Sequence, residues 1–82
     1  MNVPAAPAAR AAVIAVCSEL LGIDEIAGSD NFFMLGGTSL TVIELTEGLL
    51  ARYGLELSLD AVFSSETLDD LALCCTPAAA RG

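Results

Sequence analysis

A loop containing two aromatic residues passes into a long helix through the stretch Asp30-Asn31-Phe32-Phe33-Met34-Leu35-Gly36-Gly37-Thr38-Ser39-Leu40. Gly36 and Gly37 permit a tight bend, and Ser39 follows just before the predicted helix begins. A helix start offers unpaired backbone N–H groups and a partial positive charge, so a hydroxyl held there is well placed to carry a phosphate ester. The two small glycines would also leave Ser39 accessible to a large modifying enzyme.

Other roles for Ser39 follow from the residues themselves. Serine is common at the N-cap of a helix, so Ser39 could serve only as a cap. A rival cap is present, because Thr41-Val42-Ile43-Glu44 has the spacing of a capping box. A serine nucleophile with its own base is excluded, since the chain contains no His, no Lys and no G-x-S-x-G elbow.

The chain before this stretch predicts one helix and a long loop. Residues 8–21 are rich in helix formers, their apolar side chains repeat at three and four positions, and Gly22 stands where a left-handed C-cap belongs. Residues 23–38 have no sustained period but carry large apolar side chains, among them Ile23, Ile26, Phe32, Phe33 and Leu35. Some of these must dock on the helices, so we expect the loop to be held in place.

The chain after it predicts further helical segments. Residues 40–53 form an amphipathic helix that ends at Gly54, with an apolar stripe wider than one packing face needs. Residues 55–59 alternate like a strand, but without a partner strand we expect an extended connector whose leucines fill the core. A helical turn over residues 61–63, capped by Ser58 or Asp60 and holding a core Phe63, precedes a last helix. That helix begins at the capping-box-like Thr67-Leu68-Asp69-Asp70, and Pro77 stops it.

Composition limits the possible partners and location. The 82 residues allow one small domain, and 3 basic against 11 acidic side chains give a net charge of −8, which repels phosphate backbones and anionic lipid. We therefore expect no nucleic-acid and no membrane partner. No apolar run reaches the ~18 residues of a membrane span, and the N-terminus lacks the pattern of a signal peptide. Three cysteines without CxxC spacing, and no His, predict no disulfide framework, no metal site and a reducing, cytoplasmic location.

The stretch 30–40 resembles the D-x-F-F-x-L-G-G-x-S-L signature of phosphopantetheine-dependent carrier proteins, and it is most similar to the peptidyl carriers of nonribosomal peptide synthesis. The resemblance extends over roughly residues 8–76, where Leu57, Leu59, Phe63 and Thr67-Leu68 also fit. It implies an all-α fold, a four-helix carrier-protein bundle with a long loop between helices one and two and a short third helix. Residues 1–7 and 77–82 are then a flexible lead-in and a flexible tail around a carrier domain of residues 8–76.

The same resemblance implies a covalent cofactor. A phosphopantetheinyl transferase would attach 4′-phosphopantetheine from coenzyme A to Ser39, beside Gly37 and Thr38, and the terminal thiol would hold an aminoacyl or acyl thioester. The protein would be a monomer without catalytic residues that serves an adenylation enzyme and condensation, ketosynthase or tailoring enzymes. A polyketide acyl carrier is the alternative within the family, and an unmodified helical interaction module is the alternative outside it.

Three positions depart from the family pattern. Thr38 stands where fatty-acid carriers usually have Asp, which favours secondary metabolism. Met34 stands where Glu or Ala is frequent and adds an apolar group near the end of the loop. Glu66 takes the place of a common Pro before the last helix, so the boundary of that helix stays open.

Four residues are candidates for contact with partner enzymes. Leu40 and Ile43 match positions that often touch partners in the family, although core packing is the alternative for apolar residues on a helix. Met34 is a third apolar candidate. Asp30 could receive Arg or Lys from a partner, but an Asx-type turn would explain it equally well.

Overall fold

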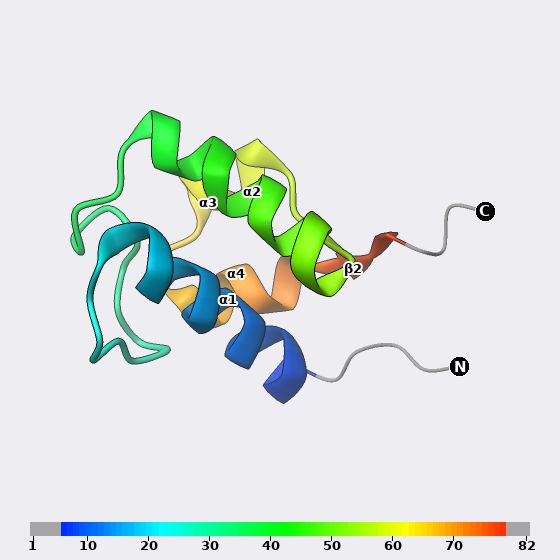
Figure 1. The fold of residues 1–82 in the computed structure, drawn as a ribbon, viewed down its shortest axis with the longest axis horizontal. Helices are drawn as coiled ribbons and strands as arrows, with labels where there is room; N and C mark the ends of the chain where they lie inside the picture. Colours follow the sequence, from blue (N-terminus) through cyan, green and yellow to red (C-terminus); the bar gives the residue numbers. More distant parts are fainter. Residues whose placement is uncertain (1–5, 79–82) are drawn as a thin grey trace.

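Four helices and a two-stranded ribbon make up residues 6–78, which are the residues that the computed structural model describes (Figure 1). Their order is α1 (Ala6–Leu21), α2 (Ser39–Tyr53), β1 (Leu55–Glu56), α3 (Leu59–Ser64), α4 (Leu68–Cys74) and β2 (Thr76–Pro77). The expected all-α bundle, with its long first loop and short third helix, is confirmed. Within this range no helix combines the length and apolar character that crossing a bilayer requires.

The core lies where α1 packs against α2 and α4. Helical periodicity turns one face of each helix inward, and side chains with no exposed surface include Val13, Cys17, Leu45, Leu49 and Leu68. Burial raises the pKa of the Cys17 thiol to about 12, because an apolar setting disfavours the thiolate. Cys17 is therefore a small neutral core residue.

The segment after α2 includes a strand with a partner. β1 pairs antiparallel with β2, with Leu55 opposite Pro77 and Glu56 opposite Thr76. The prediction of a partnerless connector was wrong, because the pairing residues lie beyond α4 and the local pattern carries no sign of them. In the segment of residues 55–59, Leu55 and Leu57 are buried as expected, whereas Leu59 is exposed at the start of α3.

The helix ends follow local sequence signals. Gly22 has the predicted left-handed conformation after α1, with φ of 69°, and Gly54, which was predicted to end the second helix, is left-handed as well, with φ of 66°. Ser58, one of the two predicted caps, accepts a hydrogen bond from the third residue of α3. Thr67 and Asp70 form the predicted capping box of α4, and that helix ends before Pro77.

The described elements extend beyond the predicted carrier domain of residues 8–76. α1 begins at Ala6 because the first turn of a helix tolerates a proline at position 7. α2 begins at Ser39, one residue earlier than predicted, and α3 is longer than the predicted turn. Pro77 belongs to β2, so the predicted tail starts inside a paired strand. Residues 1–5 and 79–82, predicted as parts of the flexible ends, lie outside the described residues.

The long loop between α1 and α2 is attached to α4. The carbonyl oxygens of Gly28 and Asp30 accept hydrogen bonds from the backbone N–H groups of Asp69 and Leu68, both at 2.9 Å. The carboxylate of Asp69 also pairs with Arg10 of α1 at 2.9 Å, and a Cβ atom on Gly28 would overlap this ion pair. The loop therefore has a defined place between two helices, as expected from its apolar side chains.

Candidate functional site

Thr38, and not Ser39, caps α2. Thr38 is extended, with φ −129° and ψ 175°, so its hydroxyl accepts from the backbone N–H of Thr41 while the Thr41 hydroxyl accepts from the N–H of Thr38 at 2.6 Å. This reciprocal pair is a capping box. The cap hypothesis for Ser39 was wrong because Ser39 already has helical geometry, and the box predicted for Thr41 and Glu44 was wrong because Thr41 is itself the third helical residue.

The Ser39 side chain is exposed and does not cap α2. Its hydroxyl makes no hydrogen bond with any residue from 6 to 78. The backbone N–H groups of Ser39 and Leu40 also have no acceptor in that range, as expected for the first residues of a helix. Two free donors and the positive helix end suit a negatively charged phosphate ester on this oxygen.

The two glycines before the helix shape the approach to Ser39. Gly36 has φ of +110°, a conformation that side-chain-bearing residues rarely adopt. A Cβ atom on Gly37 would overlap the ring of Phe32, which is buried and anchors the loop. Gly36 is thus required by the turn and Gly37 by its close packing against Phe32. Neither glycine places a side chain next to Ser39.

Asn31 fixes this loop, although the sequence analysis gave it no role. Its Oδ1 accepts hydrogen bonds from the N–H groups of Phe33 and Met34 at 2.9 and 3.0 Å, and its Nδ2 donates to the carbonyl oxygen of Glu66 at 2.7 Å. An Asx-turn preference is the one sequence signal that could have indicated the local bonds. The bond to Glu66 carried no such signal.

Asp30 and Glu66 have structural partners. The Asp30 carboxylate accepts the N–H of Ala27 at 2.9 Å, and the N–H of Asp30 donates to the Ala27 carbonyl oxygen at 3.0 Å, so Asp30 closes a turn with an earlier residue instead of the predicted Asx-type turn. Contact of Asp30 with a partner stays a prediction. The N–H of Glu66 donates to the Asp70 carboxylate at 3.2 Å, a bond that proline could not make, and α4 still begins at Leu68.

Apolar side chains around the start of α2 are exposed. Met34, Leu40 and Ile43 have exposed fractions of 85%, 65% and 43%. Core packing is therefore excluded for Leu40 and Ile43, which the sequence left open. Exposed apolar side chains near one point are typical of a surface that other proteins contact, but no partner is present, so these contacts remain predictions.

The aromatic residues extend from the loop to α3. Phe32 and Phe33 meet edge to face with ring centroids 5.4 Å apart, and Phe33 stacks on Phe63 at 5.7 Å. Phe32 is buried and anchors the loop, whereas Phe33 is half-buried. The core prediction for Phe63 was wrong. Its side chain is 55% exposed, because the face of α3 that enters the core is the one that carries Val62.

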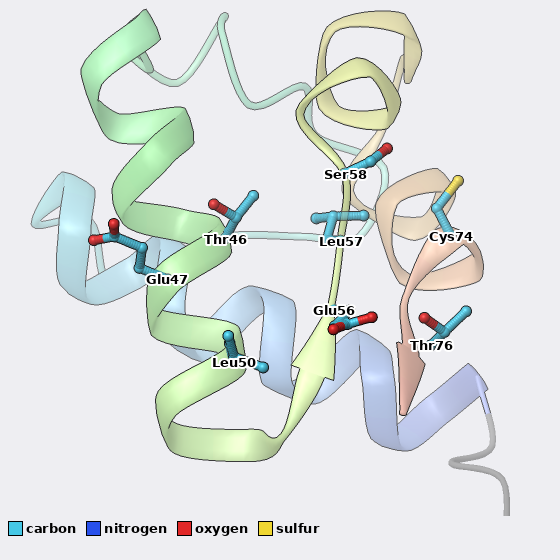
Figure 2. Close-up of a pocket in the computed structure, with 8 residues that line it drawn as sticks. All are labelled: Thr46, Glu47, Leu50, Glu56, Leu57, Ser58, Cys74 and Thr76. Atoms are coloured by element: carbon cyan, nitrogen blue, oxygen red, sulfur yellow. The ribbon is translucent and has the colours of Figure 1, made fainter. Parts of the chain in front are cut away.

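An open groove lies between α2, the segment that contains β1, and the end of α4 (Figure 2). Its volume is about 490 Å³. The lining residues are Thr46, Glu47, Leu50, Glu56, Leu57, Ser58, Cys74 and Thr76. The sequence did not indicate this groove, because its walls come from separate segments and share no motif.

The cysteines form neither a disulfide nor a metal cluster within the described range. Cys74 is exposed and lies in the groove. Burial, followed by the nearby Cys74, raises the pKa of Cys75 to about 11, and its thiol donates to the Leu71 carbonyl oxygen. Cys75 is therefore a protonated thiol at neutral pH.

Comparison with known proteins agrees with this geometry. The family described as phosphopantetheine attachment site matches residues 11–75. A solved structure titled Non Ribosomal PCP domain superposes with a TM-score of 0.78 at 36% identity, covering 84% of this chain and 88% of that one. The chain belongs to the peptidyl carrier proteins, a phosphopantetheine-dependent family. Its cofactor is covalently attached 4′-phosphopantetheine.

Curated relatives of this peptidyl carrier are very large synthetases. Malpibaldin synthetase of Mortierella alpina is 40% identical over 57 residues, which are 70% of this chain and 1% of the synthetase. Phosphinothricin tripeptide synthetase PhsB of Streptomyces viridochromogenes is 36% identical over 77 residues, 94% of this chain and 6% of that protein. The chain thus spans only a small fraction of these relatives. Its family is a non-catalytic carrier family, which implies synthetase domains as partners.

Proposed function

We propose that Ser39 is the residue that carries 4′-phosphopantetheine. One observation supports this most strongly: the Ser39 hydroxyl is exposed and without a hydrogen bond in residues 6–78, because Thr38 performs the capping. Gly37 and Thr38 shape the backbone beside the modified oxygen. The free N–H groups of Ser39 and Leu40 stabilise the phosphodiester charge.

The modification needs an enzyme that supplies the base. The chain has no His and no Lys, so a phosphopantetheinyl transferase removes the Ser39 proton. The serine oxygen forms a bond to the β-phosphorus of coenzyme A, and the bond to the bridging oxygen breaks, releasing adenosine 3′,5′-bisphosphate. The residues of this protein present the oxygen and accommodate the new charge. They contribute no catalytic group.

The carrier then presents a thioester to other enzymes. The arm supplies a thiol that holds an aminoacyl or acyl group, and its effective concentration at a docked active site far exceeds that of a free substrate. An adenylation enzyme loads it, and condensation, ketosynthase or tailoring enzymes consume it in nonribosomal peptide or hybrid assembly. Met34, Leu40 and Ile43 are the exposed apolar side chains beside Ser39 that these partners contact.

We further propose a cytoplasmic, monomeric carrier with its functional domain in residues 8–76. Three free cysteines, one of them exposed, are compatible with a reducing compartment. A polyketide acyl carrier is the second candidate, supported by the similarity to the hybrid PKS-NRPS synthetase poxE of Penicillium oxalicum at 29% identity over 62 residues.

Intact-mass measurement tests the attachment. The apo protein is incubated with coenzyme A and a broad-specificity transferase, and we expect one phosphopantetheinyl adduct. Ser39→Ala should gain none, while the control Ser29→Ala, which changes another exposed serine, should be loaded fully. An equal adduct on Ser39→Ala would place the arm on another residue, and no adduct on the wild type would leave an unmodified helical module.

A panel of substrates then separates the two pathways. Holo protein is offered to adenylation enzymes with amino acids and, separately, to an acyltransferase with acyl-coenzyme A. Loading by the adenylation enzymes is expected. Loading by the acyltransferase alone would favour the polyketide candidate.

A further inference from the structure

We propose that the groove between α2, the β1 segment and α4 is a seat for the distal, pantetheine part of the arm carried by Ser39. This inference rests on Ser39 being the attachment site. It assigns a ligand of stated chemistry, a neutral chain of amides and methylenes, to the groove of Figure 2.

The groove lies on the same side of α2 as Ser39. Residues seven and eleven positions apart share a helix face, so Ser39, Thr46 and Leu50 lie along one line. Ile43, four positions after Ser39, lies between them and is exposed. An arm leaving Ser39 along this face therefore crosses Ile43 before it enters the groove.

The length of the arm matches this distance. A rise of about 1.5 Å per residue places Thr46 about 10 Å and Leu50 about 16 Å along the helix from Ser39. About thirteen bonds separate phosphorus from sulfur in the arm, which extend to roughly 16 Å at about 1.2 Å per bond, as in an extended polypeptide. The groove is within reach of the arm without any change in the fold.

The walls of the groove complement pantetheine. Leu50, which is 48% exposed, offers apolar surface to its methyl and methylene groups, and the largely buried Leu57 adds a small apolar area to the lining. The Thr46 hydroxyl donates to the Ile43 carbonyl oxygen, which leaves its lone pairs for an amide N–H. The Ser58 hydroxyl accepts from an α3 N–H, which leaves its proton for an amide carbonyl.

The volume of the groove and the charges in its lining are also compatible with pantetheine. The volume of about 490 Å³ falls within the roughly 300–1,000 Å³ of small-molecule sites. Pantetheine is uncharged beyond its phosphate, so the carboxylates of Glu47 and Glu56 in the lining do not repel it. Because a short tether gives an effective concentration in the millimolar range, even a weak seat is occupied for much of the time and still releases the arm to partners.

The first test compares amide chemical shifts of the apo and holo proteins by NMR, after intact mass has verified loading. We expect shifts at Thr46, Leu50, Leu57 and Ser58 in addition to those beside Ser39. Leu50→Gln should abolish the groove shifts, whereas Ala51→Gln, the next residue and outside the lining, should retain them. An adduct without groove shifts, or groove shifts retained in Leu50→Gln, would overturn the seat and leave the attachment proposal intact. Absence of the adduct would overturn the attachment itself.

The second test uses Cys74 as a proximity probe. Holo protein with Cys75→Ser is equilibrated with oxidised glutathione, which takes two electrons from a thiol pair as their disulfide forms. We expect a disulfide between the arm and Cys74, mapped by mass spectrometry. In a matched variant, Leu73→Cys with Cys74→Ser and Cys75→Ser, the thiol is exposed on the same helix but outside the groove. Its cross-link should be weaker by about fivefold or more, because only docking raises the local thiol concentration. Equal yields, or no cross-link to Cys74, would overturn the proposal.

Discussion

The side-chain Nδ2 of Asn31 donates a 2.7 Å hydrogen bond to the carbonyl oxygen of Glu66, 35 residues further along the chain. The same amide group accepts two backbone N–H groups of its own loop. One side chain therefore joins the loop that leads to Ser39 with the segment that leads to α4. The position of Ser39 therefore depends on a contact with a segment distant in sequence.

Removing this amide should destabilise the protein. Asn31→Ala leaves two N–H groups and one carbonyl without their partner, so we expect the free energy of unfolding to fall by about 1–3 kcal/mol in urea denaturation. Asn31→Asp keeps the acceptor and should lose less. Ser29→Ala, in the same loop, is the control and should change little. Equal stability of Asn31→Ala and wild type would contradict the role of this residue.

The hydroxyls of Thr38 and Ser39 are adjacent, but only that of Thr38 caps α2, so their removal should have different effects on stability. Thr38→Val removes the N-cap of α2 and should cost about 1 kcal/mol in the free energy of unfolding, while Thr38→Asp, which can still cap, should cost less. Ser39→Ala should stay within about 0.5 kcal/mol of wild type, because this hydroxyl has no partner among residues 6–78. Thermal or urea unfolding gives these values. A larger loss for Ser39→Ala than for Thr38→Val would reverse the assignment.

The contact between Gly37 and Phe32 should be visible as coupling. Gly37→Ala places a methyl group against the buried Phe32 ring, so we expect a loss of about 1–3 kcal/mol in the free energy of unfolding. Phe32→Leu makes room, and the double variant should lose less than the sum of the two single changes. Strictly additive losses would show that the two side chains do not compete for the same space.

The buried thiol of Cys17 makes stability depend on pH at the alkaline end. Its pKa is about 12 in the fold against 9.0 as the reference value, so the unfolded chain loses this proton first. Stability from this group is complete below pH 9.0 and is lost as the pH rises through about 12. Urea midpoints measured across this range should fall, and Cys17→Ala should reduce the fall. An identical pH profile in that variant would exclude Cys17 as the cause.

Local patterns were sufficient to predict much of the fold. The stripes of α1 and α2, the glycines that end them and the Thr67 box are signals carried by neighbouring residues, and each is confirmed. The pairing of β1 with β2 and the stacking of Phe33 on Phe63 join residues distant in sequence, so no local pattern could reveal them.

In the candidate site, too, local patterns predicted some features, whereas others depend on residues distant in sequence. The motif identified Ser39 as a candidate, and the family resemblance added Leu40 and Ile43, whose exposure the sequence could not decide. It could not decide between Thr38 and Ser39 as the cap, because both are good capping residues and only the backbone geometry separates them. The bond from Asn31 to Glu66 and the groove along α2 required the assembled helices.

Mapping the adduct by peptide mass spectrometry tests the central proposal most directly. Cleavage after arginine releases residues 11–52, in which serines occur only at positions 18, 29 and 39. After loading from coenzyme A, we predict that fragmentation of this peptide places the whole phosphopantetheinyl mass on Ser39. The adduct on either of the other serines, or on a peptide outside 11–52, would contradict the account.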